Sequence, residues 1–305
     1  RPQFNFTARR NWINDPNGLV FHDGLWHLFF QHNQDAPTWG KMWWGHAVSS
    51  DLFHWKQVEN ALCPDGMGSM FSGSAVVDHE NTAGFGENAL LIFYTAFGNH
   101  AEPARTTSQC LAYSTDKGKH WTKHDGNPIV EWMESDNRDP KVVWHKSTRR
   151  WIMALYLEDD RYCLLSSSDA KTWMRFQEIR LNGDSECPDF FPIADDTGAE
   201  KWVFSGAGGS YSVGDFDGTI EAKILLHQAL HCLKTVLQLV SSLLPIHRSY
   251  LNKYTMKLED KNMSNKENKT PKAPGLNETG GFHFEGHIKI FDPETGEVFQ
   301  DKRNA

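Results

Sequence analysis

Three stretches of this chain, far apart in sequence, each place a carboxylic acid beside or near a proline. Asp15 lies in Trp12-Ile13-Asn14-Asp15-Pro16-Asn17-Gly18, Asp139 in Asn137-Arg138-Asp139-Pro140-Lys141, and Glu186 in Ser185-Glu186-Cys187-Pro188-Asp189. Such bends are places where a fixed carboxylate could face a pocket. Two carboxyl groups flanking one bond are what hydrolysis of a glycosidic bond requires. The competing interpretation is that Asp15 and Asn17 only cap a turn.

The first acid is followed by a predicted pair of strands. Residues 19–21 and 25–30 are β-branched and aromatic, and Asp23-Gly24 between them is a turn signal. We therefore expect Asp15 on a tight bend at the entrance to a strand.

One phrase recurs along the chain, with a hydroxyl residue, an aspartate and then a tryptophan four or five positions later. Its aspartates are Asp51, Asp116 and Asp169, which are 65 and 53 residues apart. Each phrase follows a short apolar run, at residues 45–49, 109–113 and 162–166. A strand, a turn and a Trp-containing strand at a spacing near 50 residues are typical of β-propeller blades.

The remaining residues before 220 support an all-β fold. They have almost no helical period, and short β-rich runs fill the gaps between the phrases. These runs are residues 74–78, 89–95, 141–145, 150–156 and 201–205.

The pattern changes after residue 219. Asp217 begins a fourth phrase, 48 residues after Asp169, but no aromatic residue follows at the expected place. Leu-rich residues 221–244 have a three-four apolar spacing that predicts an amphipathic helix ended by Pro245. We therefore predict four parts: a propeller domain with four blades in residues 1–219, an atypical helical segment in 220–256, a polar linker in 257–281 and a β-hairpin in 282–305.

Composition narrows the classes of partner. The 305-residue chain has a formal net charge of −8, so it lacks the basic surplus that neutralises nucleic-acid phosphates. Its five cysteines form no C-x-x-C pair, and its 15 histidines follow no metal-binding spacing. We predict no metal or other cofactor, no nucleic-acid partner and no membrane partner.

The three acid boxes, in this order, resemble glycoside hydrolase family 32, the β-fructosidases (invertase, inulinase and levanase). The resemblance covers about residues 1–219 and implies a five-bladed propeller. A fifth blade and the β-sandwich of that family are not recognisable in this sequence. Our hypothesis is that the tail, especially residues 221–244, covers the side left open. Families 43 and 68 share the propeller, but the Asn-Asp-Pro-Asn-Gly box favours family 32.

The resemblance also implies a role for each acid. Asp15 would be the nucleophile, Glu186 the acid/base, and Asp139 a stabiliser that binds sugar hydroxyls. Arg138 would keep Asp139 charged. Like charges and burial would raise the pKa of Glu186 so that it holds a proton near neutral pH.

Six further residues are implied to bind a terminal fructose. Asn14 and Gln31 carry both donors and acceptors, and Trp39 offers a flat apolar face. Taken singly, each has an alternative interpretation as a turn, strand or core residue. The implied substrate-binding set is Asn14, Gln31, Trp39, Phe71, Ser72 and Arg138.

The expected activity is release of terminal β-D-fructosyl units from sucrose, inulin or levan through a covalent fructosyl-aspartate intermediate. Transfer of fructose to another sugar would use the same residues. The alternatives are a binding protein with impaired turnover and a non-functional truncated or chimeric propeller. We expect a secreted or periplasmic protein whose leader is not present in this chain, with a cytoplasmic location left open.

Overall fold

The computed structural model describes residues 6–135, 137–194 and 197–218, together with the backbone of 227–229, 287–291 and 298–303. Up to Pro245 the chain forms one compact unit, in which the described strands make four antiparallel sheets of four strands each. The first sheet consists of β1 (Trp12–His22), β2 (Leu25–Asn33), β3 (Trp43–Ser49) and β4 (Lys56–Gln57), and the second of β5 (Ser69–Asp78), β6 (Ala89–Phe97), β7 (Ser108–Ser114) and β8 (Thr122–Lys123). The third sheet consists of β9 (Arg138–His145), β10 (Arg150–Glu158), β11 (Arg161–Ser167) and β12 (Met174–Arg180). The fourth consists of β13 (Asp189–Ala194), β14 (Glu200–Ser205), β15 (Tyr211–Gly214) and β16 (His227–Ala229).

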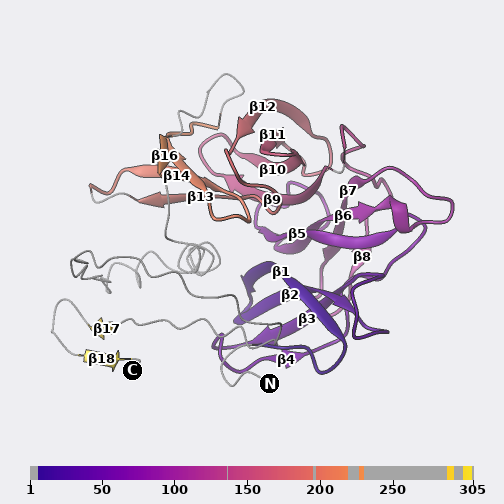
Figure 1. Cartoon of the computed structure of the whole chain (residues 1–305), viewed down its shortest axis with the longest axis horizontal. Coiled ribbons are helices and arrows are strands. Elements are labelled where there is room, and N and C mark those ends of the chain that lie inside the picture. Colours follow the sequence, from indigo (N-terminus) through magenta and orange to yellow (C-terminus); the bar gives the residue numbers. More distant parts are fainter. Residues whose placement is uncertain are drawn as a thin grey trace, which may run out of the picture. The chain divides into compact units, whose positions relative to one another are not determined.

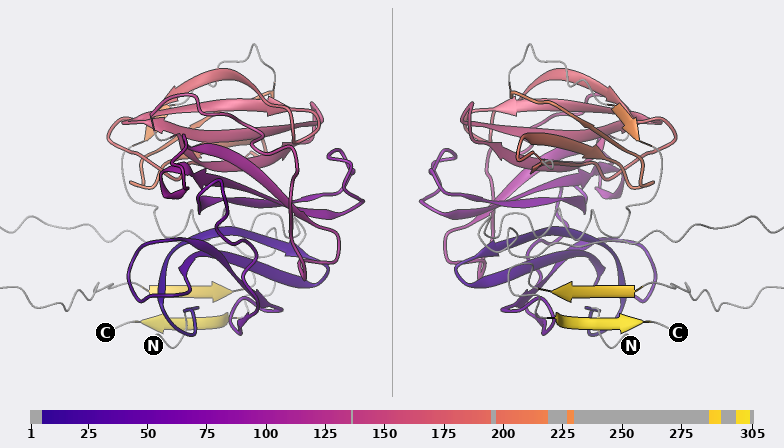
Figure 2. Two further views of the ribbon diagram at one scale, coloured as in Figure 1. Left: turned by 90° about the vertical axis from the view of Figure 1, so that its right-hand side faces the viewer. Right: turned by 90° about the vertical axis from the view of Figure 1, so that its left-hand side faces the viewer.

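The four sheets follow one another as propeller blades. Each is a simple meander in which consecutive strands pair. The first strands of successive sheets lie side by side, β1 with β5, β5 with β9 and β9 with β13 (Figure 1). Figure 2 shows the first three sheets as successive layers from indigo through purple to pink. The predicted all-β propeller arrangement is confirmed for four blades.

Alternating side chains of each strand build the cores between neighbouring sheets. In β10, for example, Met153 and Leu155 pack toward the second sheet, whereas Ile152 and Ala154 pack toward the fourth. Phe29 and Trp44 of the first sheet pack with Leu90 and Ile92 of the second. Because strand side chains alternate between faces, a strand buried on both sides carries a continuous apolar run.

The repeated phrases form the turns between the third and fourth strands of three sheets. The carboxylates of Asp51, Asp116 and Asp169, which we call the outer-turn aspartates, each accept hydrogen bonds from two backbone N–H groups two to four residues further on. Each also accepts one from the serine two residues before it, Ser49, Ser114 or Ser167. The hydroxyl residue of each phrase directly precedes the aspartate. The hydroxyl that donates to the aspartate belongs instead to the serine one residue earlier.

The first predicted bend lies inside a strand. The turn at Asp23-Gly24 is confirmed, since both residues have a positive φ. The prediction of a bend at the strand entrance is wrong, because β1 already begins at Trp12. Instead, the pairing of β1 with β2 shifts register between Ile13 and Pro16. Such an irregularity re-aims a side chain without ending the strand, and Asp15 lies within it.

The fourth sheet extends into the range that was predicted to be helical. β16 (His227–Ala229) pairs antiparallel with β15, so the helix prediction is wrong for these three residues. An extended segment here supplies the backbone partners that the edge of β15 would otherwise lack. The rest of 220–256 and the linker 257–281 lie outside the described residues.

A second compact unit begins at Ile246. Within it β17 (His287–Phe291) and β18 (Val298–Arg303) pair antiparallel, in the range where the hairpin was predicted. In the described part of the chain, the single helix is the 3₁₀ turn η1 (Gly98–His100), and no helix is long and apolar enough to cross a membrane.

Candidate active site

The structure brings all nine residues predicted for the site to the wall of one pocket of about 390 Å³. Seven of them lie on β1, β2, β5 and β9 of the first three sheets, Trp39 lies between β2 and β3, and Glu186 lies in the segment that precedes β13. Two residues that the sequence analysis did not select, Phe97 and Cys187, complete the wall. In the described residues, no group of three or more His, Cys, Asp or Glu side chains is arranged to hold a metal ion.

Asp15 is held by its neighbour on the next sheet. The hydroxyl of Ser72 on β5 donates a hydrogen bond to Asp15 Oδ2 at 2.7 Å. The two strands approach closely at Gly18, where a Cβ would lie only 2.7 Å from the backbone nitrogen of Ala75. Glycine at the end of the Asn-Asp-Pro-Asn-Gly box therefore permits the approach that brings Asp15 and Ser72 together.

Asp139 has a left-handed backbone, with a φ of 64°. Its N–H donates to Thr95 Oγ1 at 2.9 Å, and the Thr95 hydroxyl donates to Gln109 Oε1 at 2.7 Å. The amide of Gln109 in turn donates to the carbonyl of Asn137 at 2.9 Å. A left-handed aspartate costs about 1–3 kcal/mol and persists where surrounding contacts impose it, so this buried chain of bonds fixes where Asp139 points.

The electrostatic setting of Asp139 differs from the prediction. Burial raises the pKa of its carboxyl to about 6, although the N–H of Cys187 donates to Oδ2 at 3.1 Å and acts to lower it. Arg138 also lowers this pKa, but its Nε lies 3.8 Å from Oδ2. Arg138 thus acts in the predicted direction, but the desolvation of the carboxylate outweighs its attraction and the pKa of Asp139 is raised overall.

Arg138 makes its short contact with Glu186 instead. Its guanidinium donates to Glu186 Oε1 at 2.6 Å and lies over the ring of Tyr156, 4.8 Å from the centroid. The prediction of a buried Glu186 is wrong, since its side chain is 51% exposed. Glu186 and Cys187 both have a positive φ, of 57° and 36°. Two of the three acids thus stand on left-handed backbone, which is uncommon outside glycine and enriched at functional sites.

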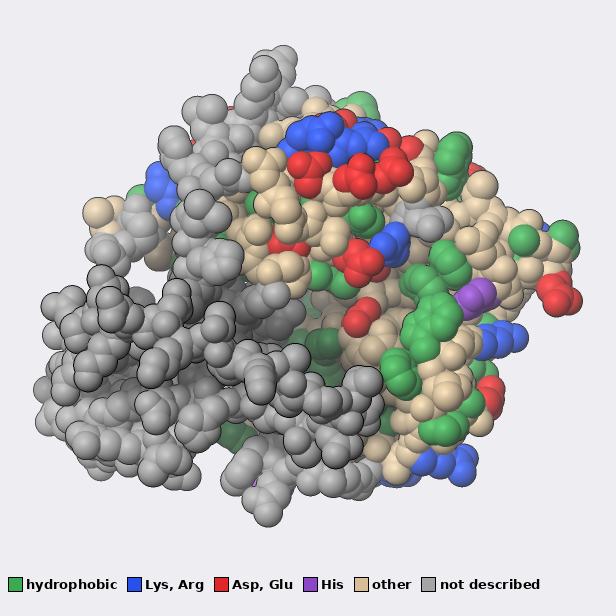
Figure 3. Space-filling view, in the orientation of Figure 1, with side chains coloured by type: hydrophobic (Ala, Val, Ile, Leu, Met, Phe, Trp, Pro, Cys, Tyr) green, Lys and Arg blue, Asp and Glu red, His purple; other side chains and the backbone are tan. Residues whose placement is uncertain are grey.

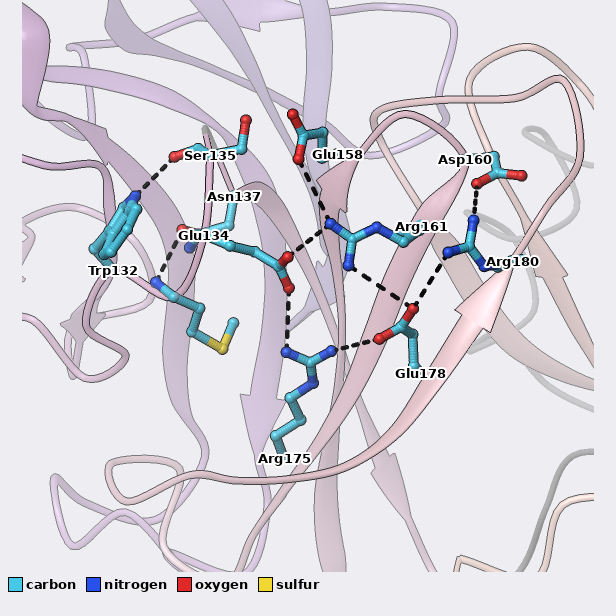
Figure 4. Close-up of polar contacts among 11 residues, drawn as sticks. Trp132, Glu134, Ser135, Asn137, Glu158, Asp160, Arg161, Arg175, Glu178 and Arg180 are labelled. Atoms are coloured by element: carbon cyan, nitrogen blue, oxygen red, sulfur yellow. Dashed lines mark hydrogen bonds and ion pairs between the residues drawn. The ribbon is translucent and has the colours of Figure 1, made fainter.

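The segment that leads into Arg138 is anchored to the third sheet by charged side chains (Figure 4). Glu134 accepts hydrogen bonds from Arg161 at 2.7 Å and from Arg175 at 3.3 Å. Glu178 lies within 4.0 Å of three arginines of the same sheet. Figure 3 shows basic and acidic side chains gathered over β11 and β12. Ion pairs at a surface are individually weak, but this network ties Glu134, four residues before Arg138, to β11 and β12.

Aromatic rings form one side of the pocket. Trp39 is 52% exposed, and its ring lies 6.2 Å from that of Phe71. Phe71 stacks on Phe97 at 4.2 Å with an interplanar angle of 8°. An exposed tryptophan backed by stacked rings is a preformed apolar platform. Phe97 ends an apolar strand and carries no sequence signal that separates it from core residues.

Amide side chains supply polar groups to the same pocket. Gln31 is 2% exposed, and its Nε2 has no hydrogen-bond partner among the described residues. Such a buried donor loses about 1–3 kcal/mol unless a ligand or water accepts its hydrogen bond. Asn14 Oδ1 accepts a bond from the indole of Trp12 at 2.8 Å, which orients its NH₂ group. The pocket therefore combines three acids, free amide donors and an apolar ring.

These features can be compared with known proteins. The family model of the glycosyl hydrolases family 32 N-terminal domain matches residues 5–226. The chain belongs to this family. The predicted family is confirmed, and the matched range extends past residue 219 to residue 226, the residue before β16 begins. The family 32 match thus includes the first three sheets, β13 to β15 of the fourth, and every residue of the pocket.

Relatives of this family 32 chain cover the same part of it. It is 42% identical to a levanase of Bacillus subtilis and 36% identical to the extracellular exo-inulinase of Aspergillus niger, each over 72% of this chain. It spans 35% of the length of the levanase and 49% of that of the exo-inulinase. A β-fructofuranosidase of Schwanniomyces occidentalis, solved with fructosyl-erythritol, is 33% identical with a TM-score of 0.65, over 75% of this chain and 49% of that one.

Proposed function

We propose that this protein is a retaining glycosidase that releases terminal β-D-fructosyl units from sucrose or fructans. The observation that carries this proposal is the convergence of the three acid boxes and their predicted partners on one pocket. Relatives named levanase and exo-inulinase, and a structural neighbour solved with a fructosyl ligand, support this substrate class.

In the first step Asp15 attacks the anomeric carbon of the fructosyl unit while Glu186 gives its proton to the leaving oxygen. The Ser72 hydroxyl orients the attacking carboxylate through its 2.7 Å hydrogen bond. Arg138 stabilises the carboxylate that Glu186 becomes when its proton has left. The product of this step is a fructosyl ester of Asp15.

In the second step Glu186 accepts a proton from water, which attacks the same carbon and frees Asp15. Another sugar hydroxyl in place of water would give transfer rather than hydrolysis. Asp139 binds hydroxyl groups of the ring in both steps. Its left-handed backbone, fixed by the hydrogen bonds described above, keeps its carboxyl in one position.

The remaining residues recognise the ring. The unpartnered Nε2 of Gln31 and the NH₂ of Asn14 donate to sugar hydroxyls, while Trp39 and Phe71 pack against the apolar face. This arrangement needs no metal ion and no organic cofactor. The name of the extracellular exo-inulinase supports secretion. We propose sucrose, inulin and levan as the substrates to test.

The deciding experiment measures fructose release from sucrose, inulin and levan by the full chain and by Asp15→Asn. We expect release by the parent chain and a loss of at least about 10³-fold in the variant, because the nucleophile is removed. Asp51→Asn is the matched control, since it changes an outer-turn aspartate, and it should keep the parent's rate.

A folded chain that releases no fructose from any of the three sugars would contradict the hydrolase. Calorimetry with fructose and sucrose would then show whether the pocket belongs to a binding protein. A cooperative thermal transition of the parent chain excludes the non-folding chimera.

We also propose that residues after the fourth sheet cover the side left open between the fourth and the first sheets, where the family resemblance implies a fifth blade. Among the described residues, clusters of buried side chains join the first sheet to the second, the second to the third and the third to the fourth, but none joins the fourth to the first. A chain that ends at Ala229 should melt well below the full chain and associate in light scattering. Equal melting temperatures of two monomeric chains would contradict this proposal.

A further inference from the structure

A carboxylate outside the proposed reaction lies two residues before Glu186. Asp184 is 5% exposed, and it has no salt-bridge partner among the described residues. A buried carboxylate costs free energy unless hydrogen bonds replace its water. Its partners therefore indicate what it contributes to the fold.

Backbone N–H groups on both sides of the carboxylate satisfy it. Oδ1 accepts from the N–H of Ser185 at 2.8 Å and from that of Gly208, and Oδ2 accepts from the N–H of Ser210 at 2.6 Å. Two of these donors lie in the turn of residues 206–210, between β14 and β15. Asp184 thus joins this turn to the segment that carries Glu186.

Glycine in the turn is required by this contact. A Cβ on Gly208 would lie 2.5 Å from Asp184 Oδ1, and a Cβ on Gly206 would lie 2.7 Å from the same atom and 2.5 Å from the hydroxyl oxygen of Tyr162. Real side-chain atoms do not approach so closely, so the run Gly206-Ala207-Gly208-Gly209 is shaped to close around one carboxylate.

The turn then holds the peptide groups beside the acid. The N–H of Ala207 is shared between the carbonyls of Ser185 and Glu186, at 3.2 Å from each. The Glu186 carbonyl also accepts from the hydroxyl of Tyr162 at 3.5 Å. Glu186 and Cys187 have positive φ angles, a conformation that is strained outside glycine and is lost without such restraints.

We infer that Asp184 is a positioning residue for Glu186. The Glu186 side chain is half exposed, so packing does little to fix its carboxyl, and the direction of its Cα–Cβ bond must come from the backbone. Asp184 sets that backbone through the turn. This inference rests on the proposed function, in which Glu186 donates and accepts the proton.

The test is Asp184→Asn in the full chain. Asparagine keeps the shape of the side chain but replaces one acceptor oxygen with an NH₂ group that faces a backbone donor. We expect kcat on sucrose to fall about 10–100-fold with KM changed less than about threefold, since a misplacement near 1 Å can cost this much. The rate of aryl alcohol release in the first turnover of an activated aryl fructofuranoside should change less than about threefold, because that leaving group needs no proton.

Asp78→Asn is the matched control. Asp78 is 1% exposed and accepts from the backbone N–H groups of Thr82 and Ala83 at 3.0 and 2.8 Å, but it lies at the far end of β5 from Ser72. Asp78→Asn should lower the melting temperature, and it should change the rates on sucrose and on the aryl fructofuranoside by the same factor. Gly206→Ala is a second variant that disturbs the same contact and should reproduce the pattern of Asp184→Asn, even if the latter folds poorly.

Two results would overturn the inference while the parent chain remains active. One is an equal loss on sucrose and on the aryl fructoside, and the other is a kcat on sucrose unchanged in both Asp184→Asn and Gly206→Ala. A parent chain that releases no fructose instead refutes the proposed function and the inference with it, so the two failures are distinguishable.

Discussion

The outer-turn aspartates and the buried acid of the pocket are the same residue type in opposite electrostatic settings. Hydrogen bonds from the backbone and ring of His54 lower the pKa of Asp51, and the backbone N–H of His120 does the same for Asp116. Burial acts to raise the pKa of Asp169, but the N–H groups of Thr172 and Lys171 lower it overall. For Asp139, burial prevails and the pKa rises to about 6.

The difference follows first from burial, since the side chain of Asp139 is 7% exposed and those of Asp51 and Asp116 are 43% and 40% exposed, and then from how many backbone donors face each carboxylate. An outer turn delivers two N–H groups to its aspartate, whereas Asp139 accepts one, from Cys187. Backbone donors stabilise the charged form, and without enough of them desolvation favours the neutral one. The turns use an aspartate to hold the chain, and the pocket holds an aspartate so that substrate hydroxyls can complete its bonds.

The largest effect that tests this contrast is expected for Asp139→Asn. Loss of the carboxylate should reduce fructose release by about 10²–10³-fold, the size seen when one stabilising group is removed from an active site. It should also stabilise the fold above pH 6. Asp139 has a folded pKa above its unfolded value of 3.8, so its contribution is favourable below pH 3.8 and is lost as the pH rises through about 6.

The expected gain in the free energy of unfolding is up to about 3 kcal/mol at pH 8, from a shift of about two pKa units. Denaturant unfolding of parent and variant at pH 4 and pH 8 measures it, and the difference should be small at pH 4. A variant that is less stable than the parent at pH 8 would show that Asp139 is held by its bonds rather than strained by burial.

The second effect, that of Asp169→Asn, is the reverse: the protein should lose stability and keep its activity. Asp169→Asn should lower the free energy of unfolding by about 1 kcal/mol at pH 7, because one oxygen that accepts hydrogen bonds is lost from the turn. The folded pKa of Asp169 lies below its unfolded value, so this contribution is present above about pH 3.8 and disappears as the pH falls further.

Fructose release by Asp169→Asn should stay within about twofold of the parent, since the turn lies between β11 and β12, away from the acids. Thermal unfolding and an activity assay on the same sample check the expected loss of stability and the expected retention of activity. A large loss of activity with unchanged stability would mean that the outer turns and the pocket are not separate in function.

The blades could be predicted because their signals are local. The apolar strand, the aspartate turn and the tryptophan stand within about 15 residues, and the inward and outward faces of a strand follow from its alternation. The prediction of helix around His227 was wrong because it used only the spacing of apolar residues. That spacing carries no information about the edge of β15, whose backbone groups form hydrogen bonds with an added strand.

The site could be predicted as a set of residues but not as a geometry. The boxes around Asp15, Asp139 and Glu186 carry the family resemblance, and their convergence on one pocket agrees with it. The partner of Arg138, the exposure of Glu186 and the left-handed backbone of Asp139 depend on contacts between different sheets. The link from Asp184 to Gly208 spans 24 residues and has no local signal.

The smallest expected effect is that of His120→Ala, and it asks which bonds in an outer turn matter. The imidazole Nδ1 of His120 lies 2.6 Å from Asp116 Oδ2, the shortest contact of that turn, but the two side chains are 85% and 40% exposed. An exposed ion pair contributes little, because water solvates both partners well when they separate. The free energy of unfolding should therefore change by less than about 0.5 kcal/mol at pH 7.

The backbone N–H of His120 still reaches Asp116 Oδ1 in this variant, at 2.9 Å in the parent. Urea unfolding of the parent and of His120→Ala at pH 7 therefore separates the contribution of the ring from that of the backbone. If the backbone donors dominate, the loss remains below that of Asp169→Asn at pH 7. A loss above about 1 kcal/mol would show that the ring of His120, rather than the peptide groups, provides most of the stabilisation that Asp116 gives to its turn.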